Sequence, residues 1–244
     1  MLQVGFKQVQ KKNLYKEGIL DSLKSSLYVY KDEFTIAVVK NREEVTLISP
    51  QNAKEIKKNR FSSIHLGVII IGILSQTRAG LDTKAHLYLY DGRFSNHTQA
   101  QLATAEVDLR NKVAVVGCLP DIDIDINEFC RKIKLSIQTK GFDMNAEYKN
   151  LRIKIFVLGR CYNKYHKKFR FINKSIVEHF HSDYVKMQIP KKLNSSELKG
   201  MEWKLPELET QSIEIPEDST IYILIKIIKL SKSLKITKNK VILK

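Results

Sequence analysis

The sequence contains few residues that interrupt a fold and few that could cross-link one. Its 244 residues include five prolines, ten glycines and three cysteines. An odd number of widely spaced cysteines, with no signal peptide, argues against a disulfide framework and indicates a reducing compartment. The longest apolar runs, 64–74 and 221–230, are shorter than the roughly 20 residues that cross a bilayer. We therefore expect a largely ordered chain without a transmembrane helix, soluble or peripheral to membranes.

Acidic residues are scarce relative to basic ones. Lysine plus arginine number 42 against 26 for aspartate plus glutamate, which gives a formal net charge of +16. Such an excess favours a polyanionic partner, either nucleic acid or an anionic membrane surface. It carries no information about the fold.

Short segments rich in strand-forming residues dominate the chain from residue 61 onward. Turn residues separate most of them, at a spacing typical of a β-sandwich or barrel. The segments are 64–74, 86–90, 102–109, 112–118, 132–138 and 151–158. Before them, Ser49 can cap and Pro50 can open a short basic helix at 49–60. The pattern predicts a mainly β protein with a few short helices.

The stretch from Tyr148 to Val177, hereafter the acid-free stretch, contains no aspartate or glutamate. Its nine cations are Lys149, Arg152, Lys154, Arg160, Lys164, Lys167, Lys168, Arg170 and Lys174. Aromatic residues lie between them, and Tyr162 and Tyr165 are the candidates for stacking on bases. Single-stranded nucleic acid needs cations along its phosphates and rings under its bases, so we interpret this stretch as a binding surface. In the alternative interpretation its phenylalanines are core residues and its lysines only keep the protein soluble.

Three aspartates follow one another at a period of two. They are Asp121, Asp123 and Asp125. On a strand they would share one face, where they could gather Mg²⁺ or Ca²⁺. The same spacing is expected of an exposed edge whose isoleucines point inward. We favour the exposed edge and predict no bound metal.

No catalytic motif is evident. A metal-dependent nuclease would have to gather Asp91, Glu106 and Asp108 with Lys112, a set that has no recognised spacing. No second cysteine pair completes a zinc site, and the sequence has neither a P-loop nor a G-x-S-x-G elbow. We predict a protein that is not an enzyme and that needs no cofactor.

Three motifs occur in an informative order. They are "EEVTLISPQNAKEIKKNRFSSIHLGVIIIGIL", "HLYLYDGRF" and "IQTKGFD". Over residues 43–160 this order resembles the thirty-kilodalton superfamily of plant virus movement proteins, and the third motif is most similar to those of plant pararetroviruses. The residues that match the family signature are Leu89, Asp91 and Gly141.

The resemblance implies a jelly-roll-like β-sandwich with terminal extensions and no enzymatic activity. Such a protein binds single-stranded nucleic acid without sequence specificity, self-associates as a homo-oligomer or tubule, and contacts membranes peripherally. It gathers at plasmodesmata of the host plant cell and transports the viral genome or particle. The implied partners are host plasmodesmal proteins and the virion coat protein. A capsid-like or nucleocapsid-like structural protein that binds nucleic acid is the alternative.

On this basis the chain divides into three parts. Residues 1–42 are an N-terminal extension, 43–185 the sandwich, and 186–244 a C-terminal extension that ends in a basic tail. Trp203 lies in a loose connector of the last part, and we expect it to dock on the core.

Asp91 follows the strand-like "HLYLY" directly. A carboxylate at the end of a strand can accept backbone N–H bonds from a turn or pair with an arginine such as Arg93 or Arg78. We predict that Asp91 holds this turn and so orients an assembly surface. The alternative is an ordinary Asp-Gly hairpin turn.

Overall fold

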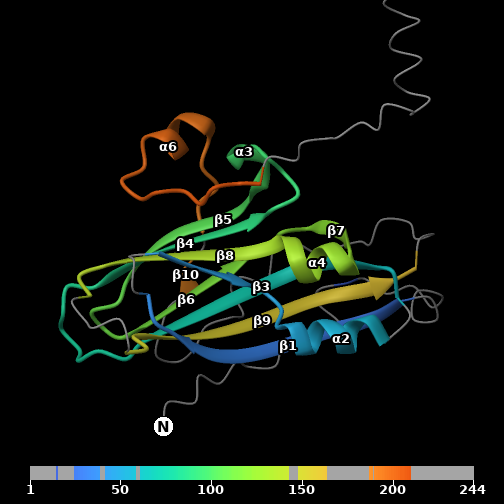
Figure 1. The fold of residues 1–244 in the computed structure, drawn as a ribbon, viewed down its shortest axis with the longest axis horizontal. Helices are drawn as coiled ribbons and strands as arrows, with labels where there is room; N and C mark the ends of the chain where they lie inside the picture. Colours follow the sequence, from blue (N-terminus) through green and yellow to red (C-terminus); the bar gives the residue numbers. More distant parts are fainter. Residues whose placement is uncertain are drawn as a thin grey trace, which may run out of the picture. The chain divides into compact units, whose positions relative to one another are not determined.

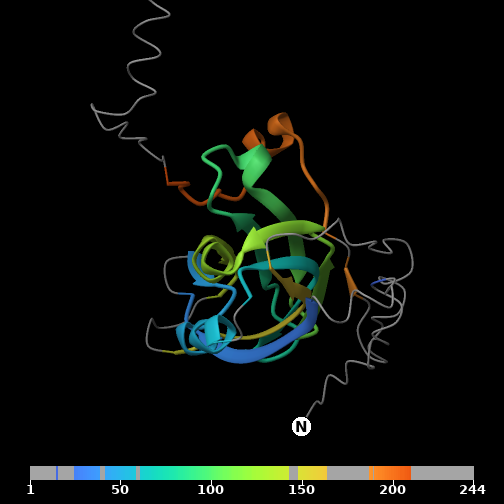
Figure 2. The ribbon, with the colours of Figure 1, turned by 90° about the vertical axis from the view of Figure 1, so that its right-hand side faces the viewer.

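The computed structural model describes residues 15, 25–38, 42–58, 61–142, 148–163, 187–188 and 190–209. Within these ranges the chain forms two β-sheets packed face to face (Figure 1, Figure 2). The predicted mainly β sandwich is therefore confirmed. Among the same residues, no helix has both the length and the apolar character needed to cross a membrane.

The first sheet has the strand order β1-β9-β3-β6-β10, with β7 also paired to β3. Its strands are β1 (Ser25–Ile36), β3 (Ser63–Ser75), β6 (Val113–Cys118), β7 (Ile122–Asp125), β9 (Leu151–Tyr162) and β10 (Met187–Gln188). All pairs are antiparallel except β10 with β6. The central strand β3 is buried along almost its whole length, which explains why its sequence is a continuous apolar run and does not alternate.

The second sheet has the order β2-β8-β4-β5. Its strands are β2 (Arg42–Thr46), β4 (Lys84–Asp91), β5 (Gln101–Asp108) and β8 (Ile133–Lys140). Along the chain, β1, β3, β6 and β9 enter the first sheet, while β2, β4, β5 and β8 enter the second. Eight strands that alternate between two sheets in this way form a jelly roll, the fold that the resemblance implied.

Short helices occupy the connections. They are α2 (Pro50–Lys58), α3 (His97–Ala100), α4 (Ile126–Lys132) and α6 (Ser195–Lys199). Helix α2 confirms the predicted basic helix, and the Ser49 hydroxyl accepts the Asn52 N–H at its start. Helix α4 is not among the elements predicted from the sequence. Its signal was available, because Asp125 caps the helix through the Asn127 N–H at 2.7 Å and Glu128 follows three residues later.

The hydrophobic core lies between the two sheets. Members from four central strands are Ile69, Ile71, Ile73, Leu87, Leu135, Ile137, Ile153, Ile155 and Val157. The signature residue Leu89 belongs to this core and is 1% exposed. Its place in the signature therefore has a packing explanation.

Two segments that were expected to be terminal extensions pack on the sandwich. Strand β1 is the edge of the first sheet and pairs with β9 along its whole length. Residues 190–209, hereafter the strap, lie against the outer face of the second sheet. Trp203 is 7% exposed and docks on this outer face, not on the core between the sheets. The tail at 210–244 lies outside the described residues.

Two signature residues mark opposite ends of one strand pair. Asp91 lies opposite Ile133 at one end of the β4–β8 ladder, and Gly141 follows the last residue of β8 at the other. Gly141 has a φ of 77°, in the left-handed region that favours glycine. A Cβ at this position would lie 2.2 Å from the backbone oxygen of Asp82. Both constraints exclude a larger residue.

Replacing Gly141 by alanine should therefore destabilise the fold by about 3 kcal/mol or more, because left-handed strain adds to a backbone clash. Gly80 is the matched control, since its φ is 86° but no atom lies within 4 Å of the point that a Cβ would occupy. Gly80→Ala should cost only the conformational strain of about 1 to 2 kcal/mol. Urea unfolding of both variants measures the difference, and equal losses would contradict the clash.

Candidate functional site

The acid-free stretch is described only in part. Lys164, Lys167, Lys168, Arg170, Lys174 and Tyr165 lie outside the described residues. Lys149 is exposed in the connection before β9, next to Tyr148, which is 60% exposed. The beginning of the stretch thus offers a cation and an accessible aromatic ring side by side.

Strands β1 and β9 present a basic patch on the outer face of the first sheet. Arg152 Nη1 and Lys154 Nζ lie 3.3 and 3.1 Å from the two carboxylate oxygens of Glu33. Lys31 lies opposite Phe156 in the ladder, and its ammonium is 5.8 Å from the ring centroid. We call Lys31, Glu33, Arg152 and Lys154 the β1/β9 patch. Lys31 could not be predicted as a member, because only the strand register brings it beside the acid-free stretch.

Arg160 does not reach the surface in the structure, which corrects its assignment as a phosphate contact. It is 2% exposed, and its Nε donates to the hydroxyl of Ser25 at 2.7 Å. Its guanidinium lies 5.8 Å from the ring centroid of Tyr15. The physical reason is that Tyr15 and Ser25 lie against its guanidinium on this face of β9.

The three aspartates at period two each serve a different group. Asp121 lies 3.0 Å from His65 Nε2, Asp123 accepts the hydroxyl of Tyr162 at 2.6 Å, and Asp125 caps α4. Burial and the bond to Asp123 raise the pKa of Tyr162 above its ordinary value. In the described ranges no cluster of histidine, cysteine or acidic side chains could hold a metal ion. The stacking of Tyr162 on a base stays a prediction.

Asp91 holds the turn after β4. It is 1% exposed, and its carboxylate accepts the backbone N–H of Arg93 at 3.0 Å and the Nη2–H of the same residue at 2.6 Å. The backbone N–H of Gly92, the residue between Asp91 and Arg93, donates to the Lys132 backbone oxygen at 2.8 Å. This bond ties the turn to the end of α4. These are the turn and arginine contacts that the sequence led us to expect. That the turn orients an assembly surface stays a prediction.

The acids of the hypothetical nuclease site do not come together. Asp91 and Asp108 lie at opposite ends of the β4–β5 pair, since Asp108 pairs with the first residue of β4. Asp108 accepts the backbone and Nε hydrogens of Arg110, and Glu106 accepts the indole N–H of Trp203 at 2.8 Å. Each carboxylate is therefore engaged separately.

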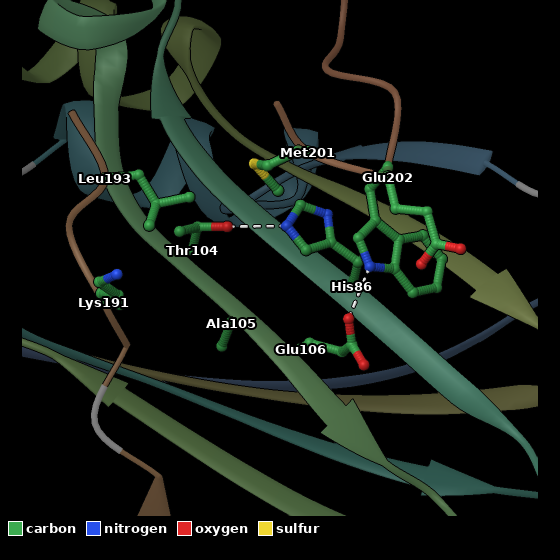
Figure 3. A pocket seen from close by; sticks show the side chains of 9 residues that line it. His86, Thr104, Ala105, Glu106, Lys191, Leu193, Met201 and Glu202 are labelled. Atoms are coloured by element: carbon green, nitrogen blue, oxygen red, sulfur yellow. Dashed lines mark hydrogen bonds between the residues drawn. The ribbon is translucent and has the colours of Figure 1, made fainter. Parts of the chain in front are cut away.

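A cavity of about 380 Å³ lies between the strap and strands β4 and β5 (Figure 3). His86 of β4 and Thr104 of β5 face each other in it, with 2.7 Å between Nε2 and Oγ1. The Trp203 ring stacks on the imidazole at a centroid distance of 5.5 Å and an angle of 15°. Burial lowers the pKa of His86 to about 4, so the imidazole is neutral at neutral pH. The indole can therefore stack on it without meeting a buried charge.

The sequence of β4 carries a signal for this second buried surface. Leu87 and Leu89 enter the core between the sheets, while Tyr88 and Tyr90 enter a separate cluster with strap residues. Large apolar side chains at both alternating positions are expected of a strand covered on both faces. The cover itself could not be identified from the sequence, because the strap follows much later in the chain.

Acidic groups of the strap meet basic groups of the second sheet and α4. Glu202 lies 2.9 Å from Lys140, and Glu209 lies 2.6 Å from Lys132. The hydrogen bond from Lys132 lowers the pKa of Glu209 below its ordinary range. The side-chain amide of Gln138 bonds both a backbone N–H and a backbone carbonyl of the strap. Backbone recognition by Gln138 and the apolar cluster around Tyr88 and Tyr90 hold the strap in place, and the ion pairs make its edge complementary to the basic groups.

The segment around Pro190 joins the two sheets along one side of the sandwich. Strand β10 pairs with Val115 and Val116 of β6, and the N–H of Lys191 donates to the Thr104 oxygen of β5 at 3.0 Å. Pro190 lines a small cavity together with core residues from both sheets. The edges of β5 and β6 are therefore both covered here by the same short segment.

Replacing Asp91 by alanine should destabilise the fold by about 2 kcal/mol, because it leaves the half-buried N–H and guanidinium of Arg93 without their acceptor. Asp108→Ala is the matched control, since Asp108 makes similar contacts with Arg110 at an exposed site. It should cost less. Urea unfolding compares the two, and an Asp91 loss no larger than the Asp108 loss would contradict the turn-holding role.

Known proteins resemble this chain in sequence. The family described as "Viral movement protein (MP)" matches residues 6–176. Polyprotein P3 of Commelina yellow mottle virus is 28% identical over 200 residues, which cover 82% of this chain and 10% of that protein. The genome polyprotein of Petunia vein clearing virus (isolate Shepherd) is 26% identical over 119 residues, covering 48% and 6%. The chain thus spans a tenth or less of the length of these relatives.

Solved structures of low sequence identity also match. One from turnip yellow mosaic virus is 8% identical, covers 59% of this chain and 96% of its own, and has a TM-score of 0.41. One of cocksfoot mottle virus is 6% identical, covers 59% and 86%, and has a TM-score of 0.38. Because the family match covers more than half of the sequence, the chain belongs to the viral movement protein family.

Proposed function

We propose that this protein carries a viral genome or particle from cell to cell through the plasmodesmata of a host plant. It binds single-stranded nucleic acid without sequence specificity and self-associates at the channel. The observation that carries this proposal is the family match over residues 6–176. Peripheral membrane contact, host plasmodesmal proteins and the virion coat protein complete the proposed set of partners.

Charge supports the nucleic-acid part of the proposal. The net charge is +16, and the acid-free stretch concentrates eight cations besides the buried Arg160. Contacts of this kind neutralise phosphates and release counterions, so affinity should fall steeply as salt rises and should not depend on base sequence. Tyr148 beside Lys149 supplies an exposed ring for stacking.

The β1/β9 patch extends this surface onto the sheet. Its three cations share one face of β1 and β9, and Glu33 lies between Arg152 and Lys154. The side chains of Glu33 and Arg152 are each 43% exposed, so a phosphate can reach the Arg152 guanidinium from solvent. Glu33 competes with that phosphate for Arg152 and Lys154, so it lowers the affinity of the patch for nucleic acid.

Glu33→Gln should therefore raise affinity for single-stranded nucleic acid. The salt dependence should steepen by about 0.7 in the log–log slope for each additional phosphate that the protein neutralises. Glu55→Gln is the matched control, because Glu55 is an exposed acid of α2 and its loss changes the net charge equally. Fluorescence anisotropy with a labelled homopolymer, repeated over a salt series, measures both. An equal rise in affinity for both variants would mean that only net charge matters and that the patch does not touch the nucleic acid.

The strand order supports one alternative. Jelly rolls are also the fold of viral capsid domains, so a capsid-like protein that encloses nucleic acid would have the same two sheets. Purified particles containing protected nucleic acid would favour this alternative over transport.

Trans-complementation in leaf tissue tests the function directly. Expressed beside a movement-defective, fluorescently marked virus, the wild-type chain should enlarge infection foci beyond single cells. Changing Lys164, Lys167, Lys168 and Arg170 together to glutamine should abolish spread, because phosphate binding is lost. The control changes Lys54, Lys57, Lys58 and Lys199, four exposed lysines on α2 and α6, and should still support spread. Wild-type confinement to single cells, despite stable expression, would refute the proposal.

A further inference from the structure

We infer that the strap and β10 exchange between copies of this protein, so that the segment of one copy covers the second sheet of the next. This inference specifies the self-association in the proposed function and rests on it to that extent. The surface involved is the outer face of β4, β5 and β8 together with the edges of β5 and β6. The occupant is residues 187–209 of a second copy.

The backbone pairing that holds the segment is short. Strand β10 has two residues in its ladder with β6, and Lys191 forms an isolated bridge with Thr104 of β5. Exposed strand edges accept a further strand from any chain that fits them. An edge covered by so few pairs can be uncovered without disturbing the ladders of the sandwich itself.

The fit under the strap leaves polar atoms unsatisfied. Among the described residues, three buried side-chain atoms have no hydrogen-bond partner: His86 Nδ1, Gln101 Oε1 and Ser136 Oγ. Gln101 and Ser136 lie opposite Tyr90 and Tyr88 in the ladders, and those tyrosines pack against the strap. All three atoms therefore lie on the strap side of the second sheet (Figure 3 shows His86). Groups buried without partners weaken the attachment of whatever covers them.

Besides its apolar cluster with Tyr88 and Tyr90, the strap makes ion pairs that are partly open to solvent. The side chains of Glu202 and Lys140 are 80% and 43% exposed, and that of Glu209 is 61% exposed. Ion pairs at such positions contribute little and are screened by salt. They match two glutamates of the strap with lysines of β8 and α4 without locking the segment to its own copy.

The covalent connection allows the exchange. Strand β10 and the strap are linked to β9 through 23 residues, from 164 to 186. A chain of that length spans at most about 80 Å. A folded domain of about 200 residues has a radius of gyration of only about 16 Å. Every copy carries both the segment and its receiving face, so exchange preserves each contact without creating new ones. Exchange between two copies closes a dimer, and exchange in one direction builds an open chain.

Split cysteine trapping tests the exchange. Thr104 and Lys191 are paired across the β5 edge, and paired strand residues have Cα atoms about 4.5 to 5.5 Å apart, within the range of a disulfide. One copy carries Thr104→Cys and a differently tagged copy carries Lys191→Cys. The two are unfolded, mixed in equal amounts, refolded and oxidised. The three native cysteines are buried, and burial raises the pKa of Cys118 and Cys161 to about 12 and that of Cys130 above its ordinary value, which keeps them from competing in the refolded protein.

A mixed disulfide between the two tagged copies is the expected result, in about half of the dimers if partners pair at random. The matched control replaces Lys191→Cys by Lys199→Cys, an exposed strap position without a partner in β5, and should give at most a trace. A chain that carries both Thr104→Cys and Lys191→Cys shows whether the two positions come close enough to form a disulfide at all.

If that single chain closes on itself while the mixed copies give no more product than the control, exchange is excluded. If it forms a disulfide neither within one chain nor between two copies, the strap contact itself is overturned. The assay contains neither virus nor nucleic acid, so either failure leaves the transport and binding tests unaffected.

Discussion

Burial of β4 on both faces is the constraint on which the rest of the structure depends. Toward the first sheet, Leu87 and Leu89 complete the core of the sandwich. Away from it, Tyr88 and Tyr90 receive the strap. The strand is flanked by β8 and β5, so its backbone bonds are satisfied on both sides. Any displacement of β4 would therefore disturb the core, the strap and both neighbouring ladders together.

The signature residues acquire a common physical meaning from this strand. Asp91 ends β4 by holding the following turn, and Gly141 ends the neighbouring β8 where only a glycine fits against Asp82. Leu89 lies between them in the core. Leu89, Asp91 and Gly141 thus all belong to the β4–β8 strand pair or its ends, although their side chains differ in chemistry. The three residues predicted as the family signature therefore share a structural role in placing β4 and β8.

Electrostatic contacts in this protein divide into two kinds. Arg160 and Asp91 are buried, and their partners fix local geometry. The contacts of Glu33, Glu202 and Glu209 are at least partly exposed, so salt and competing anions can displace them. A polyanion bound on the β1/β9 patch would compete with Glu33, and rising salt would weaken that binding together with the ion pairs of the strap. Binding and assembly are therefore expected to respond to the same ionic conditions.

Much of the fold could be predicted from local pattern, whereas contacts between distant segments could not. The sequence by itself determined the strands, the cap at Ser49, the basic excess and the order of family motifs, because these follow from side-chain type and spacing. Only the tertiary structure decided which cations remain accessible. Arg160 is enclosed because Tyr15 and Ser25 lie against it, whereas Arg152 of the same strand is 43% exposed and pairs with Glu33. The physical reason is that burial depends on which segments meet in space, and spacing along the chain does not specify those meetings.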